Sequence, residues 1–295
     1  MNDLAADELT CVWSVAAHLG EGPFWSASAR ALWFVDIKQR QVHCFHPATA
    51  LQESWNAPDQ PGFVLPMQGD TLVVGMPRRL CRFDPVDGSF TDLVAVESNL
   101  PRNRLNDGFV DAAGRLWFGS MDDAEEAPTG ALYRWDGSGA PLRQDDGIII
   151  TNGPATSPDG TVLYHTDTLE RTVYAFDLGS NGMLANKRVF VRIEDEAGYP
   201  DGMAVDADGR VWIALFGGWG IRCYAPSGKL LRFVRFPCAN VTKLTFGDDD
   251  LRTIYATTAR KGLDDAARLA QPLAGGLFAF RSDRPGLPQA EVAHG

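Results

Sequence analysis

The chain has 295 residues, of which 45% are hydrophobic and 22% are charged, as in an ordinary soluble globular protein with a large core. This length accommodates one large β barrel, sandwich or propeller. A formal net charge of -11 disfavours binding to nucleic acid or to an anionic membrane, whereas it suits a protein that holds a cation.

The amino-terminal residues 1–10 are acidic and have no apolar core, so they are not expected to form a secretory signal. No apolar run approaches the ~20 residues that are needed to cross a bilayer. The cysteines number 5 and form no C-x-x-C pair, which supports neither a disulfide framework nor a thiolate zinc site and predicts free, buried or half-buried thiols. We therefore expect a cytoplasmic protein in a reducing compartment.

An apolar strand is predicted at Leu9–Ala16, ahead of the first full repeat of the chain. We expect this strand to pair with the last repeat as its outermost strand, because that arrangement leaves fewer sheet edges open. No linker interrupts the sequence, which predicts a single domain over residues 1–295. The one notable helix candidate, Leu263–Leu273, is short.

One strand pattern recurs along the chain at intervals of 40 to 48 residues. The six apolar and aromatic strands that define it are Leu32–Val35, Leu72–Gly75, Leu116–Gly119, Val162–His165, Val211–Ala214 and Thr253–Ala256. A second alternating strand follows each copy, and a turn rich in Gly, Pro, Asp or Asn follows most of them. Six such copies, each with about four strands, predict an all-β fold, a six-bladed β-propeller with a central channel.

Four of the repeats carry an oxygen-bearing side chain at the same position, and these are Glu21, Asn106, Asn152 and Asp201. Equivalent positions on the first strands of a propeller form a ring around its channel, so we expect the four side chains to converge. Two carboxylates and two amides form a hard oxygen set that suits a divalent cation such as Ca²⁺, Mg²⁺ or Mn²⁺. The alternative is that the four residues satisfy backbone groups at turns or along the channel.

Arg104 lies two residues before Asn106, so strand alternation places both side chains on one face. Arg104 would then point into the channel and donate hydrogen bonds to the oxygens of a substrate; the alternative is an ion pair with Asp107 or Asp123. The sequence shows no nucleophile triad, and His165 is expected to be a structural hydrogen-bonding residue. The irregular loops 122–129 and 216–220 could border the site.

Five motifs together resemble the SMP-30/gluconolactonase/luciferin-regenerating-enzyme (LRE) family, and within it the bacterial sugar lactonases that act on xylonolactone or arabinolactone. The motifs span essentially the whole chain in the family's order, at Leu19–Trp25, Arg104–Gly108, Thr151–Pro154, Tyr199–Gly202 and Gly275–Phe278. The resemblance implies a six-bladed propeller with one divalent metal ion in its channel, which could be Ca, Mg, Mn, Zn or Fe.

The resemblance further implies metal ligands at Glu21, Asn152 and Asp201, and substrate-binding residues at Arg104 and Asn106. One departure is Ala124, since animal members of the family carry a substrate-contacting glutamate there, and either of the preceding residues Asp122 and Asp123 could replace it.

The expected activity is hydrolysis of a small-molecule sugar lactone, an aldonolactone, with Asp201 as the candidate general base. A metal-dependent hydrolase of aryl esters or phosphotriesters, and a non-enzymatic cation-binding or interaction propeller, are the alternatives; Phe216 and Trp219 leave the first of these open. No obligate protein partner is expected.

Overall fold

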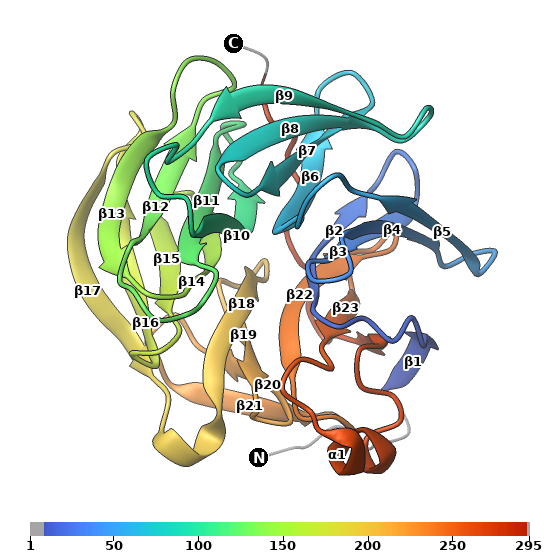
Figure 1. Ribbon diagram of the computed structural model, residues 1–295. Coiled ribbons are helices and arrows are strands. Elements are labelled where there is room, and N and C mark those ends of the chain that lie inside the picture. Colours follow the sequence, from blue (N-terminus) through green and yellow to red (C-terminus); the bar gives the residue numbers. More distant parts are fainter. Residues whose placement is uncertain (1–8, 294–295) are drawn as a thin grey trace.

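The structure of the protein is a computed structural model, and it describes residues 9–293. Within this range the strands β1 to β24 form six four-stranded antiparallel sheets. The sheets are arranged as blades around a central axis (Figure 1). The first strand of each blade packs against the first strands of both neighbouring blades, so the ring is closed. The predicted all-β, six-bladed propeller is confirmed.

Each blade places four strands in order from the axis outwards, except that the sixth takes its outermost strand from the start of the chain. The innermost strands are β2 (Gly20–Ser26), β6 (Phe63–Met67), β10 (Asn103–Val110), β14 (Thr151–Thr156), β18 (Tyr199–Val205) and β22 (Val241–Gly247). The second strands are β3 (Ala31–Asp36), β7 (Thr71–Met76), β11 (Leu116–Asp122), β15 (Val162–Asp167), β19 (Val211–Phe216) and β23 (Thr253–Thr258). The third strands are β4 (Gln41–His46), β8 (Arg79–Asp84), β12 (Gly130–Trp135), β16 (Thr172–Leu178), β20 (Gly220–Tyr224) and β24 (Leu277–Arg281). The outermost strands are β5 (Leu51–Asn56), β9 (Ser89–Ala95), β13 (Leu142–Ile148), β17 (Leu184–Arg192), β21 (Leu230–Arg235) and β1 (Thr10–Trp13).

The sixth blade joins the two ends of the chain, because β1 pairs antiparallel with β24. Its strand is shorter than the expected Leu9–Ala16, and a register shift follows Cys11. Trp13 then packs edge-on against Phe34 of the first blade, with the ring centroids 5.4 Å apart. The ends of the domain predicted over residues 1–295, including most of the acidic amino-terminal segment, lie outside the described residues.

Helices are scarce among residues 9–293. The 3₁₀ turn η2 (Asp195–Ala197) precedes the fifth blade, and α1 (Asp265–Ala270) lies within the predicted short helix at Leu263–Leu273. The Asp264 side chain caps α1 by accepting a hydrogen bond from the Ala267 backbone N–H. Over the described part of the chain, neither helix has the length and apolar character that a membrane span requires.

Two of the repeats are held by the same aspartate-centred turn. Asp111 accepts hydrogen bonds from the Trp117 indole N–H, at 2.8 Å, and from the Arg115 guanidinium, at 2.6 Å. Asp206 makes the matching bonds to Trp212 and Arg210, at 2.9 and 2.7 Å. A buried indole and a carboxylate therefore fix the turn between the first two strands of a blade in the same way in Val110–Trp117 and Val205–Trp212, whose sequences align without a gap.

The interior holds free thiols and neutral imidazoles. All five cysteines are free, and four of them are buried, as predicted. The prediction for His165 is wrong, because this buried side chain has no hydrogen-bond partner for either ring nitrogen among the described residues. Burial instead lowers the pKa of His165 to about 3, so the ring stays neutral without a partner that fixes its tautomer.

We predict that His165→Leu makes the protein less sensitive to acid. A histidine whose folded-state pKa lies below its unfolded value of 6.5 stabilises the fold above that pH and loses this contribution as the pH falls towards about 3. Between pH 7 and pH 5 the variant should lose about 2 kcal/mol less unfolding free energy than the wild type. Urea unfolding across this range measures the difference, with the offset at pH 8 subtracted as the packing effect of the substitution. Parallel pH profiles for the two proteins would contradict the prediction.

Candidate functional site

The four side chains of the predicted ring lie at the same irregularity in four innermost strands. The antiparallel register shifts between Glu21 and Phe24, between Leu105 and Gly108, between Asn152 and Ala155, and between Pro200 and Met203. A bulge inserts an extra residue and re-aims its side chain. Gly22 and Gly153 adopt positive φ angles of 56° and 43° within two of these bulges, which explains the glycine that follows each ligand position there.

The bulges bring Glu21, Asn106, Asn152 and Asp201 to one cavity of about 290 Å³. The four side chains are buried, with exposed fractions between 3% and 6%. Arg104, also buried, lines the same cavity. All five site residues expected from the sequence are therefore brought together from four blades.

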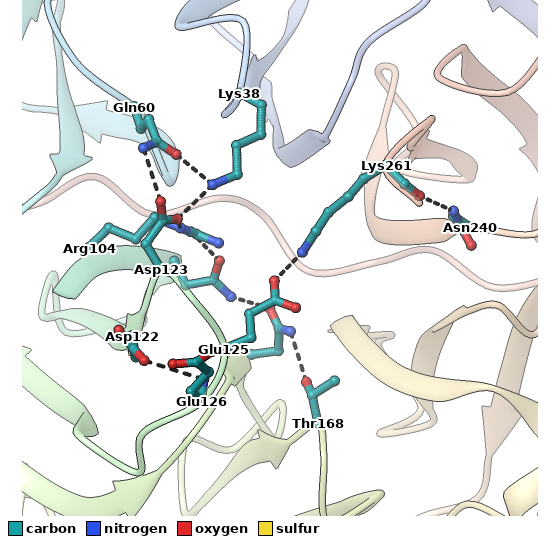
Figure 2. A network of polar contacts seen from close by, with 12 residues as sticks. Lys38, Gln60, Arg104, Asp122, Asp123, Glu125, Glu126, Thr168, Asn240 and Lys261 are labelled. Atoms are coloured by element: carbon teal, nitrogen blue, oxygen red, sulfur yellow. Dashed lines mark hydrogen bonds and ion pairs between the residues drawn. The ribbon is translucent and has the colours of Figure 1, made fainter. Parts of the chain in front are cut away.

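A chain of hydrogen bonds that runs from Arg104 to Thr168, both labelled in Figure 2, fixes the two amides. The Arg104 Nη1 donates to Asn106 Oδ1 at 2.6 Å, and the Asn106 Nδ2 donates to Asn152 Oδ1 at 2.9 Å. The Asn152 Nδ2 in turn donates to Thr168 Oγ1 at 2.9 Å. Each amide oxygen has two lone pairs, so Asn152 Oδ1 keeps an acceptor site for a cation or a ligand.

A buried ion pair lies directly behind the ring. Lys243 on β22 pairs with Asp107 and also donates to the Gly108 carbonyl at 2.9 Å. A Cβ atom at Gly202 would lie 2.5 Å from the Lys243 side chain, so the glycine after Asp201 makes room for this lysine. Sequence reasoning missed Lys243, although a buried lysine is unusual and this one lies within the innermost strand β22.

Arg104 pairs with Asp123, which was one of the alternatives, and not with Asp107, which is occupied by Lys243. The Arg104 Nε lies 2.6 Å from Asp123 Oδ1, and Lys38 Nζ lies 2.6 Å from the same oxygen. The guanidinium is therefore held from the loop side while its Nη1 faces the ring of amides.

The loop after β11 forms part of the cavity mouth, as expected. Asp122 is buried and accepts hydrogen bonds from the backbone of its own turn, so it does not reach the cavity. Glu125, the residue after Ala124, lines the cavity and forms an ion pair with Lys261, which comes from the loop after β23 (Figure 2). No periodic signal in the sequence marks Lys261 or Glu125, because neither residue occupies a repeated position.

The second loop named from the sequence, 216–220, contributes Phe216 to the lining of the cavity. Trp219 is not among the residues that line this cavity, and its side chain is exposed.

Comparison with known proteins gives the same assignment as the motifs. A family model described as the SMP-30/Gluconolactonase/LRE-like region matches residues 19–260. The chain belongs to this family. It is 35% identical to regucalcin of Sus scrofa, over 93% of this chain and 94% of that protein. It is 36% identical to L-arabinolactonase of Azospirillum brasilense, over 98% and 96%.

A solved structure has the same architecture. The crystal structure of a calcium-binding protein, regucalcin, from Agrobacterium tumefaciens superposes with a TM-score of 0.92 at 27% identity, and covers 96% of each chain. The propeller described above therefore matches a crystal structure over nearly the whole chain.

The charges in the cavity fit a divalent cation. Burial, followed by the charge of Asp107, raises the pKa of Glu21 to about 8. Burial, followed by the charges of Glu21 and Asp107, raises the pKa of Asp201 well above its ordinary value. Two carboxylates in this position resist simultaneous ionisation, and a cation between them would favour the ionised forms. Their oxygens, together with an amide oxygen, are the donors that a hard or borderline divalent ion takes.

We predict that Glu21→Gln has opposite effects on stability in the absence and presence of metal. A raised carboxyl pKa costs stability as the pH rises from 4.5, the unfolded value, towards about 8, because the unfolded chain ionises first. In chelator at pH 7 the neutral variant should therefore be more stable than the wild type, by on the order of 2 kcal/mol. Saturating divalent metal should raise the free energy of unfolding of the wild type more than that of the variant.

Urea unfolding in chelator and in excess Ca²⁺, Mg²⁺ or Mn²⁺ measures both effects. Glu196→Gln, at an exposed position of η2, is the matched control and should change neither. Equal stabilisation of the wild type and of Glu21→Gln by metal would exclude Glu21 as a ligand.

Proposed function

We propose that this protein is a metal-dependent lactonase that hydrolyses an aldonolactone, a small cyclic sugar ester, to the aldonic acid. One observation carries the proposal: two carboxylates, two amides and an arginine, all buried, converge on a single small cavity. The similarity to an L-arabinolactonase supports a pentono-1,4- or 1,5-lactone as substrate. The expected cytoplasmic location and the independence from nucleic acid, membranes and an obligate protein partner stay predictions.

In this proposal Glu21, Asn152 and Asp201 would hold one divalent ion, which could be Ca, Mg, Mn, Zn or Fe. When bound, the ion would polarise the ring carbonyl of the lactone and stabilise the charge that develops on its oxygen. Regucalcin of Agrobacterium tumefaciens is described as a calcium-binding protein, which supports a cation in this fold.

The protein's own groups have separate roles in the proposed reaction. Arg104 and Asn106 would bind the sugar hydroxyls and hold the ring in a fixed orientation. Asp201 would accept a proton from the attacking water as the water oxygen bonds to the carbonyl carbon. The bond from that carbon to the ring oxygen then breaks, and the ring oxygen takes up a proton and becomes a hydroxyl group.

The cavity wall leaves one other hydrolase class to be tested. Met121, Ile150 and Phe216 give the cavity an apolar side, which could pack against an aryl ester or a phosphotriester as well as against a sugar ring. Of the two aromatic residues considered from the sequence, only Phe216 lines the cavity and Trp219 does not, so the apolar surface is smaller than expected. Aryl esters and phosphotriesters therefore belong in the same substrate panel as the aldonolactones.

Removal of metal should abolish turnover. We predict that dialysis against chelator lowers aldonolactone hydrolysis by at least about tenfold, and that a divalent ion restores it. A pH-indicator assay over pentono- and hexonolactones, aryl esters and phosphotriesters measures the rate. Full activity of the metal-free protein would contradict metal dependence, and inactivity on all lactones in the presence of each metal would contradict the lactonase proposal.

Asp201→Asn should lower kcat by about 10²-fold or more, because it removes the proposed base and one ligand charge. Asp208→Asn, at an exposed position of the neighbouring turn, is the matched control and should leave kcat unchanged. Unchanged turnover in Asp201→Asn would exclude Asp201 from both roles.

Arg104→Lys should weaken substrate binding without removing the metal. A lysine cannot reproduce the planar fork that bonds to Asp123 and Asn106 together, so KM should rise by about tenfold or more while metal content stays the same. Kinetics and metal analysis on the same preparation separate the two effects. The control is Arg102→Lys, in the turn immediately before β10, whose side chain is 60% exposed. An unchanged KM in Arg104→Lys would contradict the proposed role.

A further inference from the structure

A second group of metal-ligating side chains lies on the third and fourth strands of the first blade, outside the cavity described above. Cys44 and His46 lie two residues apart on β4, so their side chains share one face. Glu53 lies directly opposite Cys44 on β5 in the antiparallel register. The pairing of these two strands therefore brings a thiol, an imidazole and a carboxylate together.

Two of the distances between the three ligand atoms are close to the edges of a tetrahedral zinc site. Cys44 Sγ lies 3.5 Å from His46 Nε2, and His46 Nε2 lies 3.1 Å from Glu53 Oε2. Bonds of about 2.3 Å to sulfur and about 2.1 Å to nitrogen or oxygen, at tetrahedral angles, give edges of about 3.6 Å and about 3.4 Å. All three atoms lie within 4.8 Å of one another, so small side-chain movements suffice to complete the triangle.

One side of this group is buried and the other side is accessible to solvent. Cys44 is 1% exposed and belongs to the hydrophobic core cluster that includes Trp33. The side chains of His46 and Glu53 are 27% and 42% exposed, so an ion can enter from solvent and retain a water molecule as its fourth ligand.

We propose that Cys44, His46 and Glu53 form a binding site for a borderline divalent cation of the zinc class, separate from the site in the channel. A thiolate and an imidazole favour zinc-like ions over Ca²⁺ and Mg²⁺, whereas the channel offers only oxygen donors to a cation. Cysteine spacing did not support a thiolate zinc site, because linear spacing rules do not detect ligands that lie on two paired strands.

Binding must release one proton. The Cys44 side chain is buried, and a buried thiol remains protonated near neutral pH when no cation is present. On binding, the S–H bond breaks, the sulfur–metal bond forms and the proton leaves to solvent. The site should therefore bind more tightly as the pH rises.

The second blade supplies a matched control. Cys81 on β8 faces Asp92 on β9, and Cys81 Sγ lies 3.2 Å from Asp92 Oδ1. The third group there is Arg79, whose Nε lies 3.0 Å from Asp92 Oδ1. A guanidinium has no lone pair for a metal and repels a cation, so this thiol and carboxylate should not form a site.

Co²⁺ titration of the full-length, metal-free protein tests the proposal. We expect thiolate-to-cobalt charge-transfer absorption in the near ultraviolet, intense d–d bands typical of tetrahedral coordination, and loss of both on addition of Zn²⁺. Cys44→Ser should abolish the charge-transfer band, and His46→Ala should weaken Co²⁺ binding at least tenfold. Cys81→Ser should retain the wild-type spectrum.

A Glu21→Gln/Asp201→Asn double variant distinguishes Co²⁺ binding at this site from binding in the channel. It should keep the thiolate band, because it changes only channel residues. Proton release on Zn²⁺ addition in weak buffer should fall by one equivalent in Cys44→Ser. His46→Ala alters a partly exposed side chain and so gives a second measurement if Cys44→Ser does not fold. The absence of a thiolate band in the wild type, or its persistence in Cys44→Ser, would overturn the proposal. This test is independent of lactone hydrolysis, since the proposed site uses no residue of the channel.

Discussion

The repulsion between two buried carboxylates, Glu21 and Asp201, is the constraint on which the rest of the channel depends. Each belongs to the innermost strand of a different blade, and a bulge in that strand turns its side chain towards the same cavity. Burial raises both pKa values; the charge of Asp107 adds to the effect on Glu21, and the charges of Glu21 and Asp107 add to the effect on Asp201. A closed ring of blades cannot relax this arrangement by moving one strand, because each innermost strand is packed between two others. A cation is the simplest way to stabilise such a pair.

The charges around this pair lie on two sides of it. Behind the ring, Lys243 neutralises Asp107, so the third carboxylate of the region does not remain uncompensated. At the mouth, Arg104 is held by Asp123. The side chains of Lys243 and Arg104 are both buried and each has a carboxylate partner, so each is fixed in place before any substrate arrives. This arrangement supplies the oriented charges that electrostatic catalysis needs.

The sequence was sufficient to predict the features that recur among the repeats, namely the number of blades and the ring of side chains in the channel. Equivalent positions gave Glu21, Asn106, Asn152 and Asp201, because a propeller converts a repeated position into a spatial ring. The blade count followed from the spacing of the aromatic strands for the same reason.

Contacts between residues that do not repeat could not be predicted in this way. Lys243 meets Asp107 from another blade, and Lys261 meets Glu125 across the mouth. No spacing in the sequence encodes either contact. His165 shows a different limit: its residue type suggested a hydrogen bond, whereas its buried position offers neither ring nitrogen a partner among the described residues.

The site therefore has two parts, the residues at repeated strand positions and the residues on loops, and the two parts should respond differently to substitution. The ligand positions are tied to bulges, to glycines at positive φ and to the packing of neighbouring blades, so few alternatives satisfy them. Asp123 and Glu125 lie on a connecting loop, where a substitution need not disturb any strand pairing. The loop can therefore change the groups that meet a substrate while the ring that would hold the ion stays intact. Ala124 fits this division: the expected glutamate is missing from its position, yet Glu125 on the same loop reaches the cavity.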